Sequence, residues 1–201
     1  MRSSKNPDPR LIESYFLYEL PQKMDWERAY SLLLLVLGEK PGACILGVDE
    51  KQREALKRFC EDFDYSYAEH GGEDQGIVDR MLGREKFFRP TAYISDGDRM
   101  EMLEGEEVSA ETRGRFLGYP EDAVSYYTGS EEPPGMELRE KLDGMEIGGE
   151  EYLELVLYVP RPDREHIEAA IEKGREREEL LEEMDRKLGI DVGSRYIEEL
   201  L

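Results

Sequence analysis

Residues 43–95 alternate between strand-like and helix-like patterns, and this alternation restricts the possible folds more than any other feature of the chain. The segments in order are a strand at 43–48, a helix at 50–63, a strand at 65–69, a helix at 74–82 and a strand at 91–95. The first strand is a continuous apolar run, which is typical of an interior strand covered on both faces. Because helices connect successive strands, the pattern favours right-handed crossovers and predicts a parallel sheet.

The remaining segments add helices before and after this unit. A chain of 201 residues with 39% hydrophobic residues suits one domain with one core. We therefore predict a single α/β domain over residues 1–201, with a small, mainly parallel sheet, helices on both of its faces and a C-terminal helical segment. Its parts are N-terminal helices at 1–38, a sheet core at 39–160 and C-terminal helices at 161–201. Gly148 and Gly149 predict a hairpin turn that leads into a further strand at 152–159.

The chain is strongly acidic, with 48 Asp and Glu residues against 27 Lys and Arg residues and a formal net charge of -21. The acidic residues are spread along the chain, which predicts a uniformly negative surface. Such a surface suits molar salt, where screening removes the self-repulsion, or an ordinary cytoplasm with a basic partner. We favour adaptation to salt. Nucleic acid is not predicted as a partner, because the surface repels phosphates and no cluster of Lys and Arg supports counterion release.

Neither a membrane location nor a metal site is predicted. The longest apolar run, at 32–37, is far too short to cross a bilayer, and the polar segment 1–10 lacks the apolar core of a signal peptide. We therefore expect a cytoplasmic protein. Cys44 and Cys60 have no Cys-x-x-Cys spacing and are predicted to be small buried apolar side chains. The prediction thus contains no metal and no cofactor.

Polar residues follow each predicted strand. Asp49 follows the first, His70 the second, and Asp96 and Asp98 the third. In a parallel sheet these positions share one rim, where ligands commonly bind. A histidine with two carboxylates can bind a divalent metal or act as a general base, so His70, Asp96 and Asp98 are the candidate residues of a hydrolase or transferase. The alternative is that the aspartates cap helices and that His70 lies in a polar turn.

A second candidate site is the short segment where one helix ends at Gly118 and the next starts at Pro120. Glycine ends helices readily and proline starts them, so the segment predicts a rigid, exposed corner around Tyr119. The arginines near this corner are Arg99, Arg113 and Arg115. Arginine binds carboxylate or phosphate through paired hydrogen bonds, so Arg113, Arg115 and Tyr119 are the candidate ligand-binding residues. Alternatively, the arginines neutralise neighbouring glutamates.

The corner also carries a resemblance to a known family. The Leu-Gly-Tyr-Pro sequence at 117–120, with Val124 after it, resembles the Leu-Gly-Tyr-Pro-x-Cys-Cys-Val corner of an uncharacterised archaeal protein family. Residues 160–164 are similar to the family's Pro-Cys-x-x-x-Cys turn, so that the resemblance covers residues from about 40 to 190. None of the family's cysteine positions holds a cysteine here. The resemblance therefore implies that any metal held by those cysteines is lost, and that the corner is retained for its shape or for the surface of Arg115 and Tyr119.

Two classes of function follow from these candidates. The first is a non-enzymatic binding or interaction module whose corner accepts a small anionic ligand or a protein partner. The second is a hydrolase or transferase that acts at the rim of the sheet. The apolar residues of the C-terminal helices, among them Tyr196, Ile197 and Leu200, also allow the chain to form a homo-oligomer.

Overall fold

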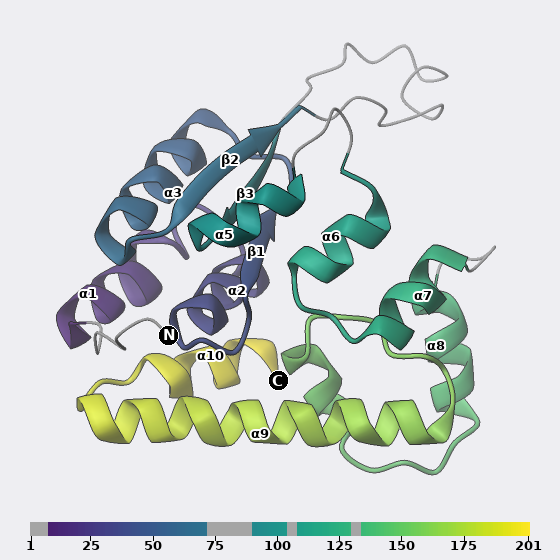
Figure 1. The fold of residues 1–201 in the computed structure, drawn as a ribbon. Helices are drawn as coiled ribbons and strands as arrows, with labels where there is room; N and C mark the ends of the chain where they lie inside the picture. The colour runs from purple at the N-terminus through teal and green to yellow at the C-terminus, as the bar shows by residue number, and fades with distance from the viewer. Residues whose placement is uncertain (1–7, 72–89, 104–107, 130–133) are drawn as a thin grey trace, which may run out of the picture.

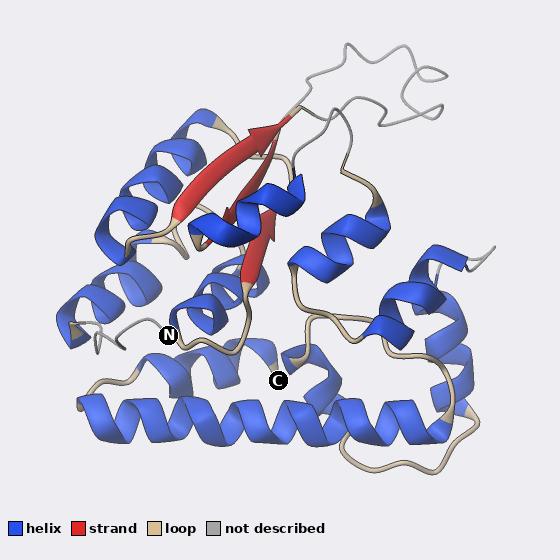
Figure 2. Cartoon of the chain, in the orientation of Figure 1, coloured by secondary structure: helices blue, strands red, loops and turns tan. Residues whose placement is uncertain are grey.

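The computed structural model describes residues 8–71, 90–103, 108–129 and 134–201, and these ranges are mostly helical around one small sheet (Figure 1 and Figure 2). The strands are β1 (Gly42–Ile45), β2 (Ser66–His70) and β3 (Thr91–Ser95). The α-helices are α1 (Pro9–Glu13), α2 (Trp26–Val36), α3 (Glu50–Phe63), α5 (Gly97–Met100), α6 (Ala110–Phe116), α7 (Glu121–Gly129), α8 (Pro134–Asp143), α9 (Arg164–Leu188) and α10 (Val192–Leu200). A π-helical segment, η1 (Ser14–Glu19), and two 3-10 segments, η2 (Glu101–Leu103) and η3 (Glu150–Leu155), complete the described elements.

The sheet is small and antiparallel in a mostly helical chain, so the prediction of a mainly parallel sheet with helices on both faces is wrong. Strand β3 lies between β1 and β2 and runs antiparallel to both. Strands β1 and β2, connected through α3, run in the same direction but are not neighbours. The apolar pattern of a buried strand is the same whatever the direction of the strand beside it, which is why the sequence pattern did not show the correct pairing. The helix predicted at 74–82 lies outside the described residues.

The two faces of the sheet pack against different apolar clusters. Ala43 and Ile94, paired across β1 and β3, belong to the large core that also contains the fully buried leucines of α2. Tyr93 points to the other face and packs with Phe116 and Leu117 of the α6 region. The alternation of side chains along β3 therefore connects the main core to a smaller cluster beneath the corner.

The C-terminal helices are held together by one buried carboxylate. Asp185 of α9 accepts hydrogen bonds from the backbone N–H groups of Val192 at 3.0 Å, Gly193 at 2.8 Å and Ser194 at 2.8 Å. These donors belong to the first turn of α10, where N–H groups have no partner within the helix. Tyr196 of α10 is fully buried in the main core. Helix α10 therefore packs inside the molecule along α9, as Figure 1 shows.

The strand predicted at 152–159 is not present. Residues 150–155 form η3, and the adjacent residues Leu155 and Val156 are both fully buried. Segment η3 packs on α9, where Gly174 allows the carbonyl of Tyr152 to come close: a Cβ atom at position 174 would be 2.2 Å from that oxygen. The alternating leucines resemble a strand pattern, but this close packing on a long helix determines the local conformation. Within the described ranges, no helix is both long and apolar enough to cross a membrane.

Candidate functional site

The predicted corner between two helices is present, and a glycine permits its close packing. Gly118, between α6 and α7, has a φ of +73°. The N–H of Tyr119 donates to the carbonyl of Gly114 at 3.0 Å and closes the turn. A Cβ atom on Gly118 would be 2.5 Å from Cδ of Pro41, so the backbone of the corner lies directly against the turn that follows α2.

Two of the arginines near the corner make contacts within the protein. Arg115 is exposed and forms ion pairs with Glu111 at 2.9 Å and Glu121 at 2.5 Å. Arg99 donates from Nε to the carbonyl of Phe116 at 2.8 Å and from Nη2 to the carbonyl of Arg115. Both carbonyls lie at the C-terminal end of α6, where a cation is electrostatically favourable. Arg99 therefore binds the C-terminal end of α6, and Arg115 links α6 to the start of α7.

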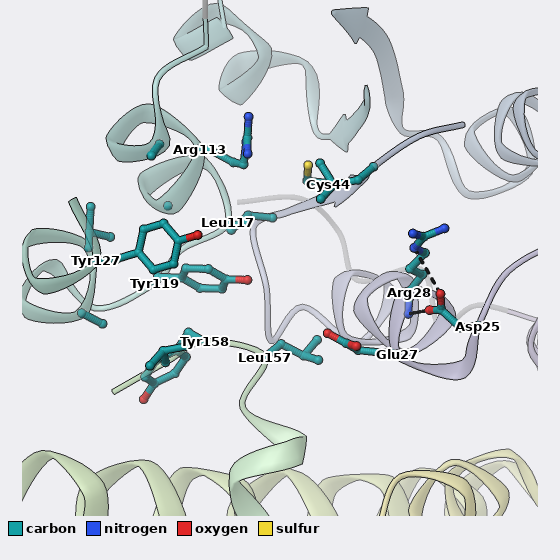
Figure 3. Close-up of a pocket in the computed structure, with 16 residues that line it drawn as sticks. Asp25, Glu27, Arg28, Cys44, Arg113, Leu117, Tyr119, Tyr127, Leu157 and Tyr158 are labelled. Atoms are coloured by element: carbon teal, nitrogen blue, oxygen red, sulfur yellow. Dashed lines mark hydrogen bonds and ion pairs between the residues drawn. The ribbon is translucent and has the colours of Figure 1, made fainter. Parts of the chain in front are cut away.

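A cavity of about 520 Å³ lies beside the corner (Figure 3). Its wall is formed by the first turn of α2, the end of β1, helices α6 and α7, and residues 157–159. Most of the lining side chains are aliphatic or aromatic, with Asp25, Glu27, Arg28 and Arg113 as the charged ones. The volume is in the range of small-molecule sites, about 300–1,000 Å³.

Arg113 is the predicted arginine that lines this cavity. Its side chain is half-buried, and Nε donates to the phenol oxygen of Tyr93 at 3.3 Å. No carboxylate of the described ranges lies within ion-pair distance of the guanidinium group. Arg113 therefore offers a positive charge to a molecule in the cavity, whereas Arg115 does not line it.

Cys44 lines the same side of the cavity and is not a reactive thiolate. Burial raises the pKa of its thiol to about 11, although Arg113 and Lys40 favour the negative form. At neutral pH the group is therefore a protonated thiol, which is a poor nucleophile and a poor metal ligand. In the part of the chain that the structure describes, no cluster of three or more His, Cys, Asp or Glu side chains is arranged to hold a metal ion.

Lys40 places a buried positive charge behind the aromatic wall of the cavity. The residue is 4% exposed, and its Nζ donates to Oγ of Ser31 at 3.1 Å. The same nitrogen lies 5.2 Å from the centre of the Tyr119 ring, which lines the cavity. Burial, followed by the positive charge of Arg177, lowers the pKa of Lys40 to about 7. Its charge therefore depends on small changes in its surroundings near neutral pH.

Arg177 of α9 is a second buried cation in this region. It is 5% exposed, and its Nη1 donates to the carbonyl of Leu155 at 2.6 Å. Its Nε is buried and has no hydrogen-bond partner among the described residues. Burial raises the pKa of Tyr119 to about 12, and the positive charge of Arg177 opposes that rise. The guanidinium group is therefore within electrostatic range of the aromatic wall. A buried cation without a carboxylate partner is costly. Arg177 does not line the cavity, so an anion bound there would offset this cost by attraction over a longer distance.

The aromatic wall consists of Tyr119, Tyr127 and Tyr158. The rings of Tyr119 and Tyr158 are 5.7 Å apart, and Figure 3 shows the hydroxyl of Tyr119 directed toward the interior of the cavity. Leu157, next to Tyr158, has a φ of +60°, a conformation that is rare for a bulky side chain. Backbone strain of this kind is concentrated at functional sites, and here it lies in the cavity wall.

The residues predicted at a common rim are not brought together. His70 at the end of β2 pairs with Thr91 at the start of β3, whereas Asp96 and Asp98 follow the opposite end of β3. The length of the strand therefore separates the histidine from the two carboxylates. The ring of His70 packs edge-on against Tyr93, with centroids 5.5 Å apart. Asp49, the remaining polar residue, caps α3 as predicted.

Lys40 and Arg177 were not predicted from the sequence. Arg177 belongs to a charged stretch at 175–179 that interrupts the apolar stripe of α9, and such a stretch is typical of a solvent-exposed surface. Its position is three residues after Gly174 and four before Leu181, both of which are buried. Helical spacing therefore placed Arg177 on the buried face and was a usable signal. For Lys40 the signal was weaker, because a lysine between two turn residues is normally exposed.

Comparison of the chain with protein-family models, with curated proteins and with solved structures finds no significant match. The likeness of residues 117–120 to the archaeal family's corner therefore stays a prediction.

Proposed function

We propose that this protein is a non-enzymatic binding module that takes up a small organic anion in the cavity beside Tyr119. The proposal keeps Arg113 and Tyr119 from the predicted ligand-binding residues and adds Lys40 and Arg177 behind them. Arg115 has the supporting role of an ion-pair partner at the corner.

The observation that carries the proposal is the pair of buried cations with no carboxylate partner among the described residues. Lys40 contacts a neutral hydroxyl and Arg177 a neutral carbonyl. The chain contains 48 acidic residues, so carboxylates that could neutralise these two cations are common in the sequence. Burying these two basic side chains without an ion-pair partner costs stability, because Glu27 favours the charged form of Lys40 through its charge but forms no ion pair with it. Functional sites commonly carry such a stability cost. Here the two cations create a positive potential that attracts an anion.

The proposal does not include catalysis. The Cys44 thiol is protonated at neutral pH, and neither histidine of the chain is among the residues that line the cavity. The lining therefore offers a recognition surface with a cation, phenol groups and apolar side chains.

Isothermal titration calorimetry at low, constant ionic strength tests the proposal, with benzoate, 3-phenylpropanoate, sulfate and phosphate as probes. We expect saturable binding of at least one anion at one site. Loss of a charge-assisted hydrogen bond in Arg113→Gln should weaken that binding about tenfold or more. Lys40→Met should weaken it less, because Lys40 acts from behind Tyr119. Native mass spectrometry of freshly purified protein checks whether an anion remains bound.

Arg115→Gln is the matched control, because Arg115 lies on the same helix as Arg113 but outside the cavity lining. We expect this variant to bind the anion as the original protein does. Absence of saturable binding for all four probes, or equal weakening by Arg113→Gln and Arg115→Gln, would rule out the cavity as the anion site.

A further inference from the structure

We propose that the ligand is an aromatic monocarboxylate and that Glu27 excludes anions carrying a second negative charge. This inference rests on the proposed function and adds the class of ligand. The apolar part of the cavity wall, its tyrosines and the acidic side chain at its edge all favour a ligand of this class.

The apolar residues favour a ligand with a hydrophobic body. Leu46 and Tyr127 are 46% and 55% exposed, which makes them two of the most exposed large apolar side chains in the described ranges, and both line the cavity. Exposed apolar groups that gather at one cavity are typical of a binding site. A fully hydrated anion such as phosphate would leave both side chains in water, whereas an apolar group would cover them.

The tyrosines favour an aromatic group in particular. Tyr119 and Tyr158 lie with ring centroids 5.7 Å apart, and Tyr127 lines the same wall. Aromatic pairs at such distances prefer tilted or offset arrangements, which allows a ligand ring to join the group. The carboxylate of that ligand then faces Arg113, on the side of the cavity near Cys44 in Figure 3.

Glu27 places a negative charge on another side of the same cavity. Its side chain is exposed, and within the described part of the chain it forms no hydrogen bond or ion pair. The adjacent acid Asp25 differs, because it caps α2 and pairs with Arg28 at 3.2 Å. Figure 3 shows the carboxylate of Glu27 directed toward Leu157.

A carboxylate at this position acts electrostatically on groups inside the cavity. It lies within electrostatic range of Tyr119, because its charge contributes to the raised pKa of that phenol, after burial and Cys44. It therefore repels any second negative charge on a ligand that already pairs with Arg113. Selection of this kind, by repulsion of the wrong ligand, is how charged binding sites reject close analogues.

The test is calorimetric titration of the full chain with two matched probes, 3-phenylpropanoate and phenylsuccinate. The second compound is the first with one additional carboxylate. Inorganic phosphate and the neutral 3-phenylpropanamide complete the series. We expect the affinity for 3-phenylpropanoate to exceed the affinities for phenylsuccinate and for the amide by about tenfold or more. In Glu27→Gln the preference over phenylsuccinate should fall several-fold, while 3-phenylpropanoate binds with nearly unchanged affinity. Glu54→Gln, an exposed acid on α3, is the control and should change neither value.

The outcomes separate this inference from the proposed function. If phosphate or phenylsuccinate binds as tightly as 3-phenylpropanoate and Arg113→Gln abolishes that binding, the anion site stands and the aromatic monocarboxylate is excluded. If Glu27→Gln leaves the preference unchanged, Glu27 is not the selecting group and the inference fails in that part. If no anion of the series binds saturably, both proposals are wrong.

Discussion

Lys40 and Ser31 form a hydrogen bond of 3.1 Å in the interior of the molecule, and the Ser31 hydroxyl accepts it from an amino group that is almost fully buried. The relationship joins the turn after α2 to the middle of that helix, on the side that faces Tyr119. A neutral partner stabilises a buried ammonium less than a carboxylate would.

We therefore expect Lys40→Met to raise the free energy of unfolding at pH 7 by about 1–3 kcal/mol. The pKa of Lys40 is about 7 in the folded chain and 10.5 ordinarily, so between these values the unfolded chain binds more protons. The original protein consequently gains stability from this residue as the pH rises from about 7 to 10, and the advantage of the methionine variant shrinks. Urea unfolding of both proteins across this range measures the effect. A methionine variant that is less stable throughout would contradict it.

Local signals in the sequence predicted several elements correctly. Asp49 and Gln52 form the capping box of α3, with hydrogen bonds of 2.9 Å in both directions, and the helix occupies the range predicted for it. Gly118 ends its helix in the left-handed conformation that was expected. These features depend on residues close together in the chain, and their side chains or backbone angles determine them directly.

Features that depend on distant residues were predicted poorly. The position of β3 between β1 and β2 depends on how the chain returns after His70, which the apolar pattern of each strand does not encode. The cavity likewise combines residues from α2, β1, α6, α7 and the segment after η3. Arg113 and Tyr119 could be selected because they lie near a recognisable corner. Lys40 and Arg177 come to the same place only through packing of α9 and the turn after α2.

The corner should tolerate no side chain at position 118. Gly118→Ala combines a left-handed backbone with a Cβ atom 2.5 Å from Pro41, so we expect a loss of about 2 kcal/mol or more in unfolding free energy. Gly38 is the matched control, because its φ of +77° is similar and a Cβ atom there meets nothing within 4 Å. Gly38→Ala should cost about 1 kcal/mol, from the backbone conformation alone. Equal losses in the two variants would show that contact with Pro41 is unimportant.

His166 should connect α7 to α9 in a pH-dependent manner. Its Nδ1 lies 2.6 Å from Oδ1 of Asp163 and its Nε2 lies 3.2 Å from Oδ2 of Asp122. The hydrogen bond to Asp163 is the main cause that raises the pKa of His166, the two carboxylate charges add to it, and burial and Arg161 oppose it. The same hydrogen bond lowers the pKa of Asp163.

The directions of these two pKa shifts determine how the stability of the protein changes with pH. The contribution of His166 is fully present below its ordinary pKa of 6.5 and is lost as the pH rises through its raised folded value. The contribution of Asp163 is present above its ordinary pKa of 3.8 and is lost as the pH falls through its lowered value. His166→Gln should therefore remove part of the stability that is lost as the pH rises above about 6.5, measured by urea unfolding. A pH dependence in His166→Gln equal to that of the original protein would assign the effect to another group.

Salt should stabilise the protein strongly. With a net charge of -21, the folded chain carries self-repulsion that counterions screen, so the melting temperature should rise steeply from low salt to molar potassium chloride. The measurement is differential scanning calorimetry over a series of potassium chloride concentrations, with sucrose at matched osmolality as a control for general solute exclusion. Chloride also competes for the cations around the cavity, so the affinity for 3-phenylpropanoate should fall over the same series. A melting temperature that does not respond to potassium chloride would rule out adaptation to salt and leave a basic partner as the reason for the acidic surface.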